Sequence, residues 1–93
     1  MSGLEYTPAT VFREEPEGGI LFDVDTGRLK LVEGVAWGIA AMIDRGASRA
    51  EILRELVGRY PDEVDLEGDL DSFLNELIKE HFLQSPERGG ACS

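Results

Sequence analysis

The sequence predicts a small α+β domain in which a three-stranded antiparallel sheet is followed by three helices (βββααα). Three short segments with strand-like composition come first, and turns that contain glycine separate them. Apolar residues then recur at helical spacing, with start and stop signals between the runs. A chain of 93 residues has room for one such domain.

The predicted strands are residues 10–13, 20–24 and 28–32. Residues 14–19 form the first turn, because Pro16 fixes one dihedral angle and the glycines that follow accept positive ones. Residues 25–27 form the second turn, since their Asp-x-Gly arrangement suits a hairpin.

The third predicted strand alternates polar and apolar residues, which is typical of a strand with one buried face. Successive side chains of a strand point to opposite faces of the sheet. We therefore expect Leu29 and Leu31 to face the core, and Lys30 and Val32 to face the other way.

The first predicted helix, residues 35–43, is apolar on nearly every side. A helix of this kind is usually buried on most sides, so we expect it at the centre of the domain with Trp37 in the core. Gly46 is the expected stop, because glycine readily takes the left-handed conformation that ends many helices.

Capping signals mark the other two helices. Ser48 and Glu51 form a capping box at the start of the second helix, and Pro61 ends it. Asp65 caps the third helix, which runs to about His81. The apolar stripes of these helices consist of Leu53, Leu56, Val57 and Tyr60, and of Leu66, Leu70, Phe73, Leu74 and Leu77.

The predicted domain covers residues 10–84, between a flexible N-terminus (residues 1–9) and a flexible tail (residues 85–93). The tail carries Cys92, the only cysteine of the chain. A lone thiol cannot form a disulfide within the chain, and we interpret Cys92 as a tail residue, with a reactive or metal-binding thiol as the alternative.

Charge restricts the partners of this chain. Nine Lys and Arg residues stand against nineteen Asp and Glu residues, a net charge of −10. Such a surface repels nucleic acids, whose affinity comes largely from cations that displace counterions. No apolar run approaches the ~20 residues of a membrane span, and residues 1–5 lack the pattern of a secretion signal. We expect a cytoplasmic protein with no membrane partner.

Catalytic patterns are poor. The single histidine, His81, has no serine or cysteine partner at a diagnostic spacing, and we interpret it as a favourable group at the end of the third helix. The acidic residues of that helix are interpreted as a solvated face rather than a cation site. The sequence therefore predicts a protein that is not an enzyme and has no cofactor or metal. A binding surface remains, formed by the open edge of strand 28–32 and walled by the third helix.

Three segments in one order resemble the PqqD family. They are the third-helix pattern D-L-x-x-F-L-x-x-L that leads to Phe82-Leu83, the run 31–39 followed by 42–46, and Ser48-x-x-Glu51-Ile52-x-x-x-Leu56 with Tyr60. The resemblance covers about residues 10–84. It departs at Glu33, Val35 and His81, where relatives often have Asn, Thr and Gly.

This resemblance implies a small winged-helix-like domain that acts as a peptide chaperone. It implies binding of the leader of a ribosomally made precursor peptide between the third strand and third helix, and its presentation to a modifying enzyme, often a radical S-adenosylmethionine (SAM) enzyme. Lys30, Val32 and Ile78 are the preferred contacts within the expected groove. The whole expected groove consists of Leu29, Lys30, Leu31, Val32, Asp71, Leu74, Asn75 and Ile78.

A winged-helix regulator that binds nucleic acid is the alternative, because three helices and a hairpin suit that fold as well. A recognition helix should turn cations toward the phosphates. The third helix instead has one lysine, Lys79, among five carboxylates, which favours the peptide chaperone. The sequence leaves both a monomer and a homodimer open.

Overall fold

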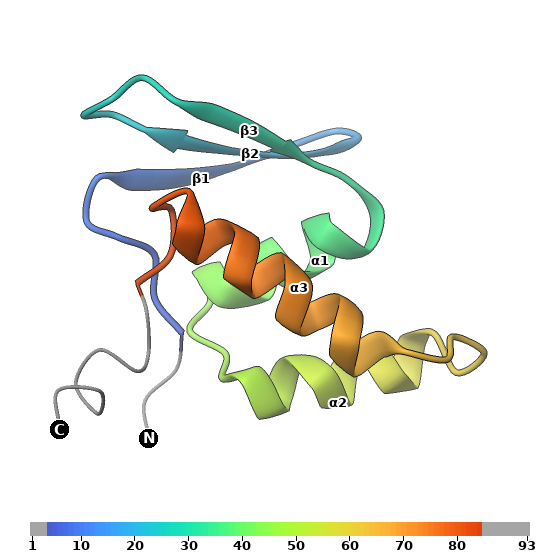
Figure 1. Ribbon diagram of the computed structural model, residues 1–93. Coiled ribbons are helices and arrows are strands. Elements are labelled where there is room, and N and C mark those ends of the chain that lie inside the picture. The colour runs from blue at the N-terminus through green and yellow to red at the C-terminus, as the bar shows by residue number, and fades with distance from the viewer. Residues whose placement is uncertain (1–3, 85–93) are drawn as a thin grey trace, which may run out of the picture.

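The computed structural model describes residues 4–84 and confirms the predicted order of three strands and three helices. The strands form one antiparallel sheet with β2 in the middle, and the helices follow in the chain (Figure 1). The elements are β1 (Thr10–Glu15), β2 (Gly18–Asp23), β3 (Leu29–Val32), α1 (Gly34–Asp44), α2 (Arg49–Arg59) and α3 (Leu66–Lys79).

All three helices lie on one side of the sheet, with α1 and α3 nearer to it and α2 farther away (Figure 1). α1 contacts all three strands, as expected for the most apolar helix, and α3 packs against α2. Trp37 is half-buried against the core rather than enclosed in it. The strands contribute Leu21 and Val32 to the core, and both side chains are almost fully buried.

The side chains of β3 point the opposite way from the prediction. Leu29 and Leu31 are 53% and 65% exposed, whereas Val32 is only 2% exposed. The cause is the pairing with β2, in which Leu21 lies opposite Lys30 and faces the helices. Residues opposite each other in adjacent strands share a face, so Lys30 and Val32 must turn inward and the two leucines outward.

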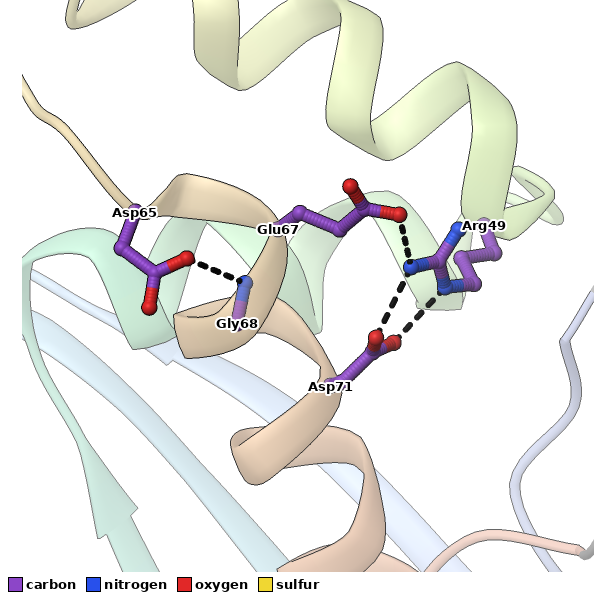
Figure 2. A network of polar contacts seen from close by, with 5 residues as sticks. All are labelled: Arg49, Asp65, Glu67, Gly68 and Asp71. Carbon is purple, nitrogen blue, oxygen red and sulfur yellow. Dashed lines mark hydrogen bonds and ion pairs between the residues drawn. The ribbon is translucent and has the colours of Figure 1, made fainter.

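The predicted capping groups are confirmed. The Glu51 amide donates to the Ser48 hydroxyl (3.2 Å) and the Ser48 amide donates to the Glu51 carboxylate (2.9 Å), which completes the capping box of α2. The Gly68 amide donates to Asp65 Oδ1 (3.2 Å) at the start of α3 (Figure 2). These contacts are local in sequence, which explains why the sequence predicts them well.

The two ends of the described chain lie side by side. The Thr7 amide donates to the Phe82 carbonyl, and the Gln84 amide donates to the Glu5 carbonyl, both at 2.9 Å. Leu4 is buried and its amide donates to the Ala47 carbonyl. Residues 4–9 thus pack against the domain, although the sequence suggested a flexible segment there. The predicted tail, with Cys92, lies outside the described residues.

α3 ends at Lys79, two residues before the predicted end, in a Schellman motif. The His81 amide donates to the Ile78 carbonyl (3.0 Å) and the Phe82 amide to the Leu77 carbonyl (2.9 Å), while His81 takes a φ of 67°. α1 ends in the same way, with a glycine, Gly46, at φ 88°. His81 therefore occupies a backbone conformation that favours glycine.

Replacing His81 with glycine should stabilise the domain. We expect His81→Gly to raise the free energy of unfolding by about 0.5–1 kcal/mol, since relief of left-handed strain outweighs the added flexibility of the unfolded chain. The matched change Gly46→Ala imposes the same strain on α1 and should lower stability by about 1 kcal/mol. Urea unfolding of both variants checks this, and a destabilised His81→Gly variant would contradict it.

Candidate functional site

β3 is an edge strand, and no segment within residues 4–84 pairs with its outer side. The Asp23 amide donates to the Arg28 carbonyl (2.9 Å) where the β2–β3 ladder begins. Backbone groups of an antiparallel edge strand point alternately toward the neighbouring strand and away from it. The backbone N–H and C=O groups of Lys30 and Val32 therefore form hydrogen bonds with β2, and those of Leu29 and Leu31 point outward.

The opposite edge of the sheet, formed by β1, is less suited to accept another strand. β1 carries the run Arg13-Glu14-Glu15, and charged residues on an edge strand discourage pairing with further chains. β3 has the sequence Leu-Lys-Leu-Val instead. The edge of β3 is thus the better acceptor for an extended peptide.

Lys30 connects β3 to α3. Its Nζ atom lies 2.5 Å from Glu76 Oε2 and 3.1 Å from Glu80 Oε1, and its side chain is only 19% exposed. Burial lowers the pKa of Lys30, but hydrogen bonds to Glu76 and Glu80 outweigh this effect and raise the pKa above its ordinary value. The Arg28 side chain also donates to the Glu80 carbonyl (3.4 Å). These contacts hold the C-terminal half of α3 beside β3.

A second polar network joins α3 to α2 (Figure 2). Arg49 donates to both carboxylate oxygens of Asp71, at 2.7 and 2.9 Å, and to Glu67 at 2.9 Å. The hydrogen bonds from Arg49 lower the pKa of Asp71. Asp71 is therefore engaged with α2 and lies on the side of α3 away from Lys30.

The structure brings together the predicted strand residues but not the predicted helix residues. Leu29, Lys30, Leu31 and Val32 all lie on β3. Of the helix positions, Asp71 binds Arg49, Leu74 is buried in the core, Asn75 is exposed, and Ile78 is partly buried against the core.

Sequence reasoning missed Glu76 on α3 and Glu80 at its C-cap, the two residues that contact Lys30 of β3. One signal could have found them: they are four residues apart, so they share one side of the helix. Phe73, three residues before Glu76, lies on the same side and is partly buried. The β3-facing side of α3 is therefore acidic with an apolar element.

Two further findings concern the described residues. In the part of the chain from 4 to 84, no three histidine, cysteine or acidic side chains are grouped closely enough to hold a metal ion. Among the helices of the same part, none has the length and apolar character that crossing a bilayer requires.

The fold and the site define a small α+β domain with an open edge strand beside a helix, an arrangement to which extended peptides can add. The family model described as coenzyme PQQ synthesis protein D (PqqD) matches residues 18–83, and the chain belongs to this family. No curated protein and no solved structure gives a significant match. Membership supports the role of a peptide-binding accessory protein in the biosynthesis of PQQ or of another ribosomally made peptide product.

Proposed function

We propose that this protein is a peptide chaperone that binds the leader of a ribosomally made precursor by strand addition to β3. The observation that carries this proposal is the free outer side of β3, where Leu29 and Leu31 present unpaired backbone groups. A leader segment in extended conformation can pair with these groups and become a fourth strand of the sheet. Main-chain hydrogen bonds then supply affinity without requiring one particular leader sequence.

Selectivity comes from the side of α3 that faces β3. Alternate side chains of the added strand turn toward the helix layer. There they meet Glu76 and Glu80, whose charges Lys30 partly neutralises, and the partly buried side chain of Phe73. This surface favours a leader that places apolar or basic side chains toward α3. The proposed groove thus keeps the four β3 residues and takes its helix wall from Phe73, Glu76 and Glu80.

The bound leader is then presented to a modifying enzyme, for which a radical SAM enzyme is the expected class. The chaperone itself does no chemistry in this proposal. Its task is to raise the local concentration of the precursor at the enzyme, as tethering does in general. Nucleic-acid binding has less support, because the exposed residues of α3 include Glu67, Asp69 and Glu76, and these repel phosphates.

The test is an NMR titration of the full chain with synthetic leader peptides of candidate precursors, taken from short open reading frames that neighbour its gene. We expect the amides of Leu29 and Leu31 to shift most and to become protected from hydrogen exchange, because they gain hydrogen-bond partners. The amides of β1 serve as the internal control, since they lie at the other edge of the same sheet. Shifts confined to β1 or to α2 would contradict strand addition to β3.

A further inference from the structure

No helix or strand within residues 4–84 covers the face of the sheet turned away from the helices (Figure 1). Val11, Phe22 and Leu29 lie opposite one another across the three strands. Arg13, Ile20 and Leu31 form the next row. Because residues opposite one another share a face, five apolar side chains form one continuous surface. We refer to Val11, Ile20, Phe22, Leu29 and Leu31 as the outer patch.

The outer patch is well exposed. Val11, Leu29 and Leu31 show 46%, 53% and 65% of their surface to solvent. Single exposed apolar side chains are common on soluble proteins, but contiguous ones usually mark a surface that another molecule covers. Leu29 and Leu31 hold no place in the core, so the fold alone does not account for their being apolar.

A cavity of about 340 Å³ opens at one end of the outer patch, next to the β1–β2 turn. Ile20, Leu31 and Pro16 form its apolar walls. Gly18 lines the cavity and, having no side chain, leaves it open. A Cβ atom at this position would lie 2.7 Å from the Val32 carbonyl oxygen, which is too close for any other residue without a shift of the backbone.

Three carboxylates, those of Glu15, Glu17 and Glu33, line the same cavity. We refer to them as the acidic rim. The cationic side chain in the adjacent row, Arg13, lies 3.7 Å from Glu15 and neutralises only part of the negative charge. A ligand group that fits here combines an apolar body with a positive charge at its end.

We propose that the outer patch and the acidic rim dock a partner protein that presents an apolar side chain flanked by lysine or arginine. Charge complementarity selects this occupant over a second copy of the chain. Two copies would each bring a net charge of −10 and would set their acidic rims near one another. A basic partner gains attraction from the same charges.

This docking surface shares Leu29 and Leu31 with the groove for the leader, but it uses their side chains, whereas the leader pairs with their backbone. The backbone groups of Leu29 and Leu31 point outward in the plane of the sheet, and their side chains stand out of that plane. A strand added at the edge of β3 therefore leaves the outer patch open. The protein can hold a peptide at its edge and a basic partner on its face at the same time.

Three small probes of equal apolar size test the chemistry of the surface: 4-phenylbutylamine, 4-phenylbutanol and 4-phenylbutyrate. None of them can add to a sheet as a strand, so the experiment is independent of leader binding. Methyl NMR titrations of the full chain should show shifts at Ile20 and Leu31, with affinity in the order amine, alcohol, acid. We expect the amine to bind at least about fivefold more tightly than the acid. Equal affinities, or shifts elsewhere, would overturn the proposal.

Variants locate the binding and identify other occupants. Leu31→Gln should weaken amine binding about tenfold, because it removes an apolar wall of the cavity. The matched control is Val57→Gln, which alters another exposed apolar residue, on α2, and should leave amine binding unchanged. Sedimentation velocity tests self-association. A dimer that Leu31→Gln dissociates would overturn the proposal in favour of a second copy.

Discussion

Leu31→Pro should weaken leader binding about tenfold to a hundredfold while the domain stays folded. The N–H group of Leu31 points away from β2, so a proline at this position removes a donor that only the leader uses. The leader carbonyl that loses its partner is left unpaired at a buried position, which costs about 1–3 kcal/mol. Isothermal titration calorimetry with the synthetic leader measures the loss, and circular dichroism reports the fold.

Two further variants separate the backbone from the side chain. Leu31→Ala removes the same side chain but keeps the N–H group, so the difference between the two affinities isolates the backbone contribution. Val32→Pro provides the opposite case, because the Val32 backbone faces β2 and its side chain is buried. We expect that variant to unfold. Equal leader affinities of Leu31→Pro and Leu31→Ala would show that the leader does not pair with β3.

The orientation of the β3 side chains shows what a local sequence pattern cannot predict. The alternation of residues 28–32 correctly predicts a strand with two different faces, but either pair of side chains could face inward. The pairing with β2 and the carboxylates of α3 decide between the two arrangements. Glu76 lies 46 residues from Lys30, so no local pattern contains this information.

The helix wall of the site has a similar explanation. The sequence identifies the buried stripe of α3, and Leu66, Leu70, Leu74 and Leu77 are indeed buried. It does not say which flank of that stripe meets α2 and which meets β3, because both flanks carry carboxylates. The bonds of Arg49 and Lys30 separate them: Asp71 faces α2, and Glu76 faces β3.

Helix caps and turns, by contrast, depend on residues within a few positions of each other. Ser48 with Glu51, Asp65, and Gly46 act as the sequence predicts. The resemblance to the PqqD family marked His81 as a departure from an expected glycine, and the positive φ of His81 is a conformation that favours glycine. The packing of Tyr6 against the core was not predicted, because a single aromatic residue in a segment without periodicity gives no local signal.

Tyr6 should make the domain sensitive to alkaline conditions. Its hydroxyl donates to the Ala40 carbonyl (2.6 Å) and its ring stacks on Phe12. Burial, and to a lesser degree the negative charge of Asp44, raises the pKa of Tyr6 well above its ordinary value of 10.0. In the unfolded chain the phenol ionises near its ordinary value. The stabilisation is therefore complete below about pH 10 and decreases by about 1.4 kcal/mol per pH unit above it.

The effect of Tyr6→Phe on the free energy of unfolding should consequently change sign with pH. At neutral pH the variant lacks one hydrogen bond and should be less stable by about 1 kcal/mol. It has no phenol to ionise, so its stability should fall less steeply above about pH 10 and exceed that of the unchanged protein above about pH 11. Urea unfolding from about pH 7 to about pH 12 measures the crossing. Lys30, whose pKa is also raised, loses its stabilisation in the same direction in both proteins and cancels from the difference.

The control is Tyr60→Phe, which keeps Tyr6 and should follow the steep alkaline loss of the unchanged protein. The crossing depends on the phenol of Tyr6 staying protonated in the folded state while that of the unfolded chain ionises. If the stability curves of Tyr6→Phe and the unchanged protein ran parallel above about pH 10, the Tyr6 phenol would ionise equally in both states. Residues 4–9 would then not hold it against α1 as the contact with Ala40 indicates.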